Sequence, residues 1–216
     1  MGHLAVIEGL DGSGKATQAT HLAAYLQELG QTVRHVSFPD YDHESSALVK
    51  LYLSGKLGSP DEVNAYAASS FYAADRYISF VSHWKKDYDA GYTIIADRYT
   101  TSNAAHQMSK LPREEWDDFL HWMEDYEYGR LALPRPSVVI YLDMDPQISH
   151  KLLRKRGSPQ DIHERDLEYL IRCREAALYA CDKLGWRKIS CDDGRNPLPV
   201  MTIFDQVKLF TMDVSF

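Results

Sequence analysis

Short apolar segments alternate with longer amphipathic segments along this chain of 216 residues. The apolar segments predict β-strands at 4–7, 33–38, 93–96, 138–142 and 187–190. Apolar positions that recur every three or four residues predict helices at 14–29, 45–54, 62–87, 101–109, 113–127, 146–154, 164–184 and 199–210. Short apolar strands separated by helices are typical of a parallel sheet covered on both faces. The pattern therefore predicts an α/β fold with a five-stranded parallel sheet, formed as a single domain by residues 1–216.

The long predicted helix 62–87 contains two stripes of residues at helical spacing. The stripe predicted to pack in the core consists of Val63, Ala67, Phe71, Ala74, Ile78 and Val81. Beside it lie Ser69, Tyr72 and Arg76. An arginine next to a core stripe usually extends its guanidinium into solvent, so the helix pattern alone favours an exposed Arg76.

The first predicted strand leads into Gly9-Leu10-Asp11-Gly12-Ser13-Gly14-Lys15-Ala16-Thr17. The segment has the G-x-x-x-x-G-K spacing of a phosphate-binding P-loop. Glycines let backbone N–H groups close around phosphate oxygens, and the helix start and Lys15 add positive charge. The motif ordinarily has Ser or Thr directly after the lysine, whereas this chain has Ala16 followed by Thr17. The spacing predicts a nucleotide-binding loop at 9–17.

Composition narrows the possible partners. The formal net charge is −7, which disfavours nucleic acid and acidic membranes as partners of the surface as a whole. No apolar run approaches the length of a membrane span, and no signal peptide is visible at the N-terminus. Cys173 and Cys181 lie eight residues apart on one predicted helix, too far for a disulfide. We therefore expect free thiols and a cytoplasmic protein.

In parallel sheets ligands bind beyond the carboxyl ends of the strands, which directs attention to Asp11, Pro39-Asp40, Asp97-Arg98 and Asp143. There Asp97 could engage Mg²⁺ or its waters, and Arg98 could bind a phosphoryl group. The segment 151–157 has four cations in seven residues. Such a segment is either a solvated helix end or a lid that closes over a phosphoryl group, and the P-loop favours the lid.

Several motifs in order resemble the thymidylate kinase family, and the resemblance extends over nearly the whole chain. They are the P-loop with its embedded Asp11, Phe71-Tyr72-Ala73-Ala74-Asp75-Arg76, Asp97-Arg98-Tyr99 with Ser102 and Ala105-His106-Gln107, and the basic segment. The resemblance implies phosphorylation of dTMP to dTDP with MgATP as donor. It also implies a homodimer.

The resemblance assigns roles to individual residues. Asp11 is expected to contact the sugar 3′-hydroxyl and the acceptor-site arginine, and Arg98 to bind the acceptor phosphate. Tyr72 is expected to stack on thymine, and Arg76 to hydrogen-bond a carbonyl of the base, which replaces the exposed position favoured by the helix pattern. The other residues expected around the base and sugar are Phe38, Ser102, Asn103, His106 and Gln107. The residues expected to hold ATP are Gly9, Gly12, Ser13, Gly14, Lys15, Ala16 and Thr17, and Asp97 is the metal candidate.

The phosphate loop contains no arginine, because Gly12 and Ser13 occupy its centre. The resemblance therefore implies that a lid at about 151–165 supplies Arg154 and Arg156, as in the bacterial type of the family. With Lys15, Asp11 and Arg98, these two arginines are the catalytic candidates.

Three residues depart from the family pattern. Ala16 lacks a hydroxyl for Mg²⁺. Asp40 would repel phosphate unless it bound a metal or turned away. His106 replaces a tyrosine that helps select deoxyribose, and it either keeps that role or only fills space. These departures keep two alternatives open: a kinase for another nucleotide or nucleoside, and a catalytically silent ATP-binding relative.

Overall fold

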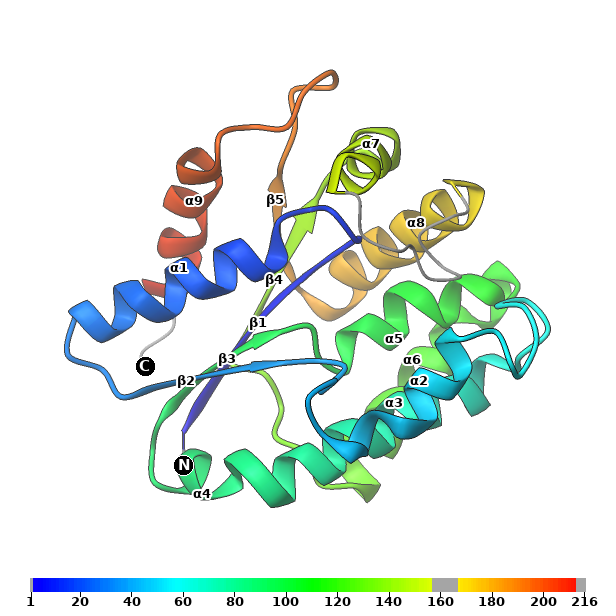
Figure 1. Cartoon of the computed structure of the whole chain (residues 1–216), viewed down its shortest axis with the longest axis horizontal. Coiled ribbons are helices and arrows are strands. Elements are labelled where there is room, and N and C mark those ends of the chain that lie inside the picture. Colours follow the sequence, from blue (N-terminus) through cyan, green and yellow to red (C-terminus); the bar gives the residue numbers. More distant parts are fainter. Residues whose placement is uncertain (1, 157–166, 213–216) are drawn as a thin grey trace.

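The computed structural model describes residues 2–156 and 167–212, with a central sheet of parallel strands (Figure 1). The strands are β1 (His3–Gly9), β2 (Val33–Ser37), β3 (Thr93–Asp97), β4 (Val138–Asp143) and β5 (Arg187–Ser190), in the order β2-β3-β1-β4-β5. Every pairing between them is parallel. The predicted five-stranded parallel sheet is confirmed.

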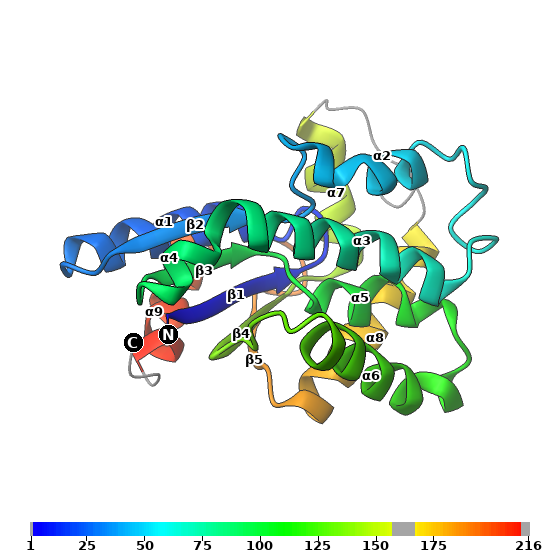
Figure 2. The same ribbon diagram turned by 90° about the horizontal axis from the view of Figure 1, so that it is seen from below.

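The α-helices connect the strands. They are α1 (Lys15–Glu28), α2 (Ala47–Leu53), α3 (Ala65–Ser79), α4 (Lys85–Asp89), α5 (Thr101–His106), α6 (Trp116–Glu124), α7 (Pro146–Arg156), α8 (Leu167–Leu184) and α9 (Val200–Met212). Figure 2 shows the sheet and helices after a quarter turn. In the described part of the chain, no helix is long and apolar enough to cross a membrane.

Separate apolar clusters cover the two faces of the sheet. On one face Leu22 of α1 and Phe204 of α9 pack with Ile7 of β1 and Ile140 of β4. On the other face the cluster contains Val6 of β1, Ile94 of β3, and Phe80 and Trp84 from the end of the α3 segment, which comprises α3 and the turn after it at 80–84. A third cluster joins α5, α6 and α8 beside the sheet. Because both faces are covered, the central strands are apolar almost throughout.

Strand register brings the candidate residues together. Asp97, at the end of β3, pairs with Ile7 of β1 on one side and with Ser37 of β2 on the other. The chain therefore leaves three neighbouring strands at one edge of the sheet, towards Asp11, Pro39 and Arg98. This is the edge at which ligands bind in open parallel sheets.

The predicted helix 62–87 is shorter and interrupted. Asn64 caps α3, because its side-chain oxygen accepts hydrogen bonds from the backbone N–H groups of Tyr66 (2.9 Å) and Ala67 (3.1 Å). A π-helical turn at Phe80–Trp84 then separates α3 from α4.

The predicted core stripe of this helix is wrong. Ile78 and Val81 are 43% and 46% exposed, whereas Ala68, Ser69, Ala73 and Arg76 are buried. The neighbouring stripe, which contains Arg76, faces the interior because Glu127 gives its guanidinium a buried partner.

Candidate active site

The P-loop joins β1 to α1. Gly12 has φ +83°, and a Cβ built on it would lie 2.8 Å from the carbonyl oxygen of Ser149, so only glycine fits. Gly14 has φ +92° and directly precedes α1. Lys15, which begins the helix, is buried and donates a hydrogen bond from Nζ to the carbonyl oxygen of Leu10 (2.9 Å). The conformations of Gly12 and Gly14 and the start of α1 thus place the Lys15 ammonium and backbone N–H groups together in the P-loop.

A cavity of about 310 Å³ opens beside this loop. It is also lined by residues after β2, from α3, and from β3 through α5. The candidates that line it are Asp11, Gly12, Gly14, Lys15, Ala16, Thr17, Phe38, Tyr72, Arg76, Asp97, Arg98, Ser102, Asn103, His106 and Gln107. Gly9 and Ser13 belong to the loop but do not line the cavity.

Arg98 lies at the centre of a network of polar side chains. It is ion-paired with Asp11 through Nη2, and its Nη1 donates to Glu8 Oε1 (3.2 Å) and Ser102 Oγ (3.3 Å). Its backbone has φ +66°, a left-handed conformation rare for a residue with a Cβ. Backbone strain of this kind occurs where surrounding contacts hold a functional residue in place.

Glu8, next to the last residue of β1, supports Arg98 and is fully buried. Its carboxylate accepts hydrogen bonds from Thr101 Oγ1 (2.8 Å), Ser102 Oγ (2.7 Å) and the N–H of Gly9 (2.9 Å), besides the one from Arg98. Hydrogen bonds to this one carboxylate therefore connect β1, the P-loop and α5.

The pKa values of Asp11, Arg98 and Lys15 depend on one another. Burial alone would raise the pKa of Asp11, but Arg98 and Lys15 hold it well below its ordinary value. Burial alone would lower the pKa of Arg98, yet Asp11 and Glu8 raise it. Burial and the neighbouring Arg98 lower the pKa of Lys15. Asp11 and Arg98 are therefore both charged over the physiological range.

His106, the residue at the tyrosine position, contacts the same cluster. Its Nε2 lies 3.3 Å from Nη1 of Arg98, and its Nδ1 lies 3.6 Å from Sγ of Cys173. Because a guanidinium has only donors, Nε2 of His106 is the acceptor in this contact. His106 thus helps to hold Arg98.

At the α3 side of the cavity, Arg76 is buried rather than exposed. Its Nε and Nη2 donate to Glu127 at 2.6 and 2.7 Å, and its Nη1 donates to the carbonyl oxygen of Tyr99 (3.3 Å). Asn103 Nδ2 also donates to Glu127 (2.9 Å). A guanidinium has five N–H groups, and these contacts use three, so Arg76 retains donors for a ligand.

Three buried polar atoms at the site have no hydrogen-bond partner among the described residues: Ser13 Oγ, Asp97 Oδ1 and Gln107 Oε1. Buried polar atoms in proteins are ordinarily paired. Asp97 and Gln107 line the cavity, where a polar ligand or a hydrated cation would supply the missing partners.

Comparison with known proteins agrees with this arrangement. A thymidylate kinase family model matches residues 7–193. The chain belongs to the thymidylate kinase family. It is 30% identical to a thymidylate kinase of Mycobacterium tuberculosis over 185 residues, 82% of this chain and 84% of that protein. It is 33% identical to a probable thymidylate kinase of Staphylothermus marinus over 183 residues, 84% of this chain and 83% of that one.

A solved thymidylate kinase structure from Candida albicans has the same fold. It superposes with a TM-score of 0.73 at 21% identity, covering 98% of this chain and 92% of that one. The predicted P-loop kinase fold is thus confirmed for this member of the thymidylate kinase family.

The structure places two of the three departures from the family pattern. Ala16 and the neighbouring Thr17 both line the cavity. Asp40 does not line the cavity, because its carboxylate accepts hydrogen bonds from Ser79 Oγ (2.8 Å) and contacts His43 Nδ1 (2.7 Å). Phe38 and Pro39, joined by a cis peptide bond, line the cavity instead.

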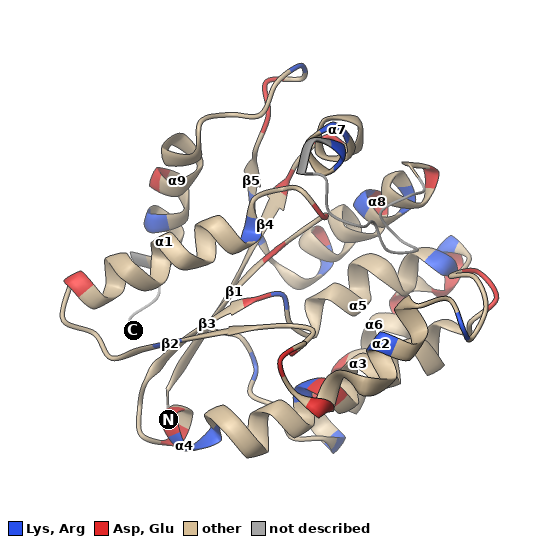
Figure 3. Cartoon of the chain, viewed as in Figure 1, with Lys and Arg blue, Asp and Glu red and all other residues tan. Residues whose placement is uncertain are grey.

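The predicted lid is described only at its beginning. Figure 3 shows the basic residues of α7. Arg154 is exposed near the end of this helix, and Leu153 lines the cavity. The side chain of Arg156 and residues 157–165 lie outside the described part of the chain. The role of the lid stays a prediction.

Two supporting carboxylates were missed by sequence reasoning. Glu8 could have been found from the sequence, since a charged residue directly after the apolar segment 4–7 requires a partner if it is buried. Glu127 had none, because it lies 51 residues from Arg76 in a π-helical turn at Asp125–Arg130. Asp143, inspected as a strand end, pairs with Arg174 of α8 and does not line the cavity.

Proposed function

We propose that this chain transfers the γ-phosphoryl group of ATP to dTMP, giving ADP and dTDP. One observation carries the proposal: a single cavity is lined by the phosphate loop, by Arg98, and by Tyr72 with Arg76. A phosphoryl donor and a nucleoside monophosphate acceptor therefore have recognition groups facing the same space.

Donor binding is assigned to the P-loop. The loop amides and Lys15 bind the β- and γ-phosphates, with the positive end of α1 behind them. Lys15 Nζ, which now donates to the Leu10 carbonyl, lies 3.7 Å from Asp11. Phosphate oxygens would replace these partners without a change of fold.

Acceptor binding is assigned to Arg98 and the groups that hold it. Arg98 binds the acceptor phosphate and aligns one of its oxygens for in-line attack on the γ-phosphorus. The new oxygen–phosphorus bond forms as the bridging β,γ bond breaks and ADP leaves. Phosphoryl transfer depends on alignment and charge stabilisation, which a guanidinium fixed by Asp11, Glu8 and His106 provides.

Base recognition is assigned to α3 and α5. Tyr72 stacks on thymine, and Arg76, held by Glu127, donates to a carbonyl of the base. Asn103, Gln107, Ser102 and Phe38 complete the base and sugar pocket. Because Glu127 fixes both Arg76 and Asn103, base recognition is set before the substrate binds.

Mg²⁺ fits the residues present. Among the described residues, one buried carboxylate oxygen of Asp97 has no hydrogen-bond partner, and Thr17 lines the same cavity. Asp97 and Thr17, directly or through water, are the groups we assign to the ion. When bound, the ion neutralises charge on the donor phosphates.

Arg154 and Arg156 are assigned to the lid. They bring positive charge to the transferring phosphoryl group and exclude water, which would otherwise accept it.

The test measures ADP release from MgATP with dTMP, dUMP, TMP ribonucleotide, thymidine, AMP and CMP as separate acceptors. We expect fast release with dTMP. Lys15→Ala should lower kcat by at least about 100-fold, because the lysine stabilises the transferring charge. Lys86→Ala, an exposed lysine of α4, is the matched control and should leave kcat unchanged.

The other outcomes contradict the proposal in distinct ways. Fast release with a different acceptor alone would retain a kinase but remove the assignment of Tyr72 and Arg76 to thymine. ATP binding without release from any acceptor would favour the silent relative that Ala16 suggested. More than a tenth of the wild-type kcat in Lys15→Ala would overturn the P-loop assignment.

We also propose that two copies of the chain form a homodimer. The exposed apolar residues of the α3 segment support it, namely Tyr77 (41% exposed), Ile78 (43%) and Val81 (46%).

A further inference from the structure

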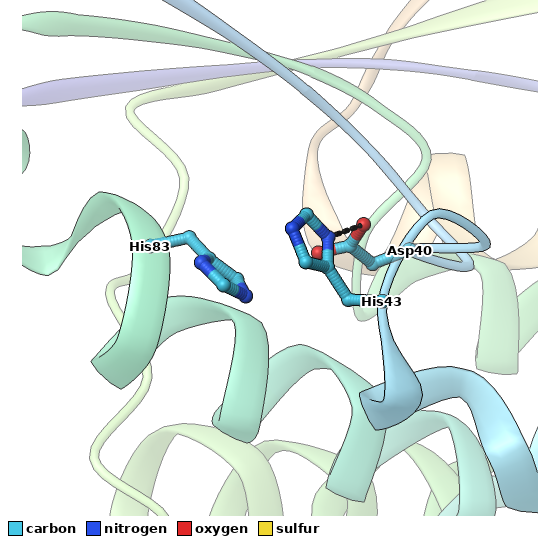
Figure 4. Close-up of side chains that lie close together, drawn as sticks. All are labelled: Asp40, His43 and His83. Atoms are coloured by element: carbon cyan, nitrogen blue, oxygen red, sulfur yellow. Dashed lines mark hydrogen bonds and ion pairs between the residues drawn. The ribbon is translucent and has the colours of Figure 1, made fainter.

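Two histidines and an aspartate lie together outside the cavity just described. Asp40 and His43 belong to the loop after β2, and His83 belongs to the π-helical turn after α3. One potential ligand atom from each residue lies within 4.8 Å of the other two. In Figure 4 the two imidazole rings face each other, with the Asp40 carboxylate beside His43.

We propose that Asp40, His43 and His83 bind one divalent transition-metal ion of the zinc type. Two imidazole nitrogens and one carboxylate oxygen are the donor set that zinc takes in sites with an open position. Mg²⁺ prefers an all-oxygen shell, so this site is distinct in kind from the magnesium site assigned to Asp97.

The three side chains are near enough to share an ion once one ring turns. Zinc–nitrogen and zinc–oxygen bonds are about 2.0–2.2 Å, so two donors on one ion are separated by at most about 4 Å. His43 Nδ1 and Asp40 Oδ1 are 2.7 Å apart, and the His43 and His83 rings are in face contact, with centroids 3.9 Å apart and planes inclined at 31°. An imidazole nitrogen binds a metal in the plane of its ring, so binding requires a ring rotation. The His43 side chain is 46% exposed, so its ring can rotate to close the remaining gap.

Asp40 is held in place for this role. Ser79 Oγ donates to its Oδ2 (2.8 Å), which leaves Oδ1 directed towards His43. The N–H of Asp40 donates to Asp75 Oδ2 (2.9 Å), and Ser45 Oγ donates to Asp75 Oδ1 (2.6 Å). Hydrogen bonds that orient a ligand in this way are typical of metal sites.

A metal at this position would join two parts of the acceptor side. Asp40 lies between Pro39 and Tyr41, both of which line the cavity. His83 follows α3, the helix that contains Tyr72 and Arg76. The ion would therefore fix the loop after β2 against the base-binding helix. Metal binding itself does not depend on the proposed kinase activity.

The experiment uses the full chain, freed of any histidine tag and treated with a chelator. Co²⁺ is titrated as the probe while visible d–d absorption is recorded, and Zn²⁺ binding is measured by calorimetry. We expect one ion per chain with a Kd below about 10 µM, and no competition from excess Mg²⁺. Saturating Zn²⁺ should also raise Tm.

The variants His43→Asn, His83→Asn and Asp40→Asn should each weaken binding by about 10-fold or more, and abolish the rise in Tm. His121→Asn, at an exposed histidine of α6, is the matched control and should bind as the wild type does. All the variants are on partly or fully exposed residues, and their circular dichroism in the absence of metal should match the wild type.

Three results would overturn the proposal. The first is unchanged affinity in both His43→Asn and His83→Asn. The second is the near-ultraviolet charge-transfer band of a Co²⁺–thiolate bond, which would place the ion on a cysteine. Absence of binding up to about 100 µM metal would likewise mean that the cluster is only a hydrogen-bonded surface contact.

Discussion

At the residue scale, the ion pair of Arg76 and Glu127 links the proposed base recognition to stability. The two side chains are 1% and 0% exposed and share two hydrogen bonds. A buried pair adds little net stability, because desolvation offsets the attraction, but loss of one partner leaves an uncompensated charge. Glu127 therefore holds the Arg76 guanidinium in one position in the absence of a ligand.

We expect Glu127→Ala to lower the free energy of unfolding by about 3–5 kcal/mol, because it leaves Arg76 charged and buried. Asp125→Ala removes the acidic partner of Arg130 in an exposed pair and should change the free energy of unfolding by less than about 1 kcal/mol. Urea unfolding of the two variants makes the comparison. Equal effects would mean that solvent reaches Arg76.

Lys110 gives a pH-dependent prediction. Burial lowers its pKa from 10.5 to about 8, although its Nζ donates to the Tyr52 hydroxyl (2.8 Å). Below pH 8 the charged amine opposes folding. Between about pH 8 and 10.5 the folded state has released this proton while the unfolded state still binds it, so the free energy of unfolding increases with pH.

The wild type should therefore gain about 2 kcal/mol of unfolding free energy relative to Lys110→Met between about pH 7 and pH 10. The difference is measured by urea unfolding at both values. Lys86→Met, at an exposed site, should show a constant difference. Parallel curves for Lys110→Met and wild type would show that the amine remains solvated.

Residues in local motifs were predictable, and their long-range partners were not. The spacing of Gly9 to Lys15 is set by one turn and one helix start, so sequence alone indicates it. The buried position of Arg76 depends on Glu127, which a distant part of the chain supplies. The helix pattern favoured an exposed arginine, and the family resemblance indicated a ligand-facing one.

At the element scale, the sheet was predictable because each strand is short, apolar and bounded by helices. The buried face of the α3 segment was not predictable, since its two stripes have similar spacing and either could have packed in the core. The stripe with more apolar residues is exposed at Ile78 and Val81, while the stripe with Ser69 and Arg76 is buried. Side-chain periodicity identifies a helix but does not identify what covers each face.

The lid is the element on which catalysis is proposed to depend most. Arg156→Ala should lower kcat by at least about 100-fold, since arginines that stabilise the transferring phosphoryl group are worth about 10³–10⁵ in rate. Lys151→Ala, an exposed cation on the same helix, should retain nearly full activity. Steady-state kinetics with dTMP and ATP, with circular dichroism as a check on folding, gives the comparison. Similar losses in both variants would indicate general electrostatic attraction instead.

At the scale of the whole molecule, the exposed apolar stripe on the α3 segment is the feature that the single chain leaves unexplained. Its spacing is that of a buried helix face, and a second copy of the chain would bury it. A stable protein–protein interface covers about 1,200–2,000 Å² in total, and large apolar residues at its centre contribute most of the binding energy. A two-fold dimer would place the same stripe of each copy in contact.

We therefore expect the wild type to have twice the mass of one chain in size-exclusion chromatography with light scattering, and Ile78→Asp and Val81→Asp to have the mass of one. Both positions are exposed in the single chain, so the new carboxylates are solvated in the monomer and desolvated only at the interface. Leu209→Asp, on α9 and 63% exposed, tests whether any added charge has this effect and should leave the dimer intact. A wild-type monomer at all concentrations, or dimers in both α3-segment variants, would contradict the assignment of this face. Retained dTMP kinase activity in a monomeric variant would further show that each copy contains a complete cavity, as the described residues of one chain already line it from the P-loop to Arg76.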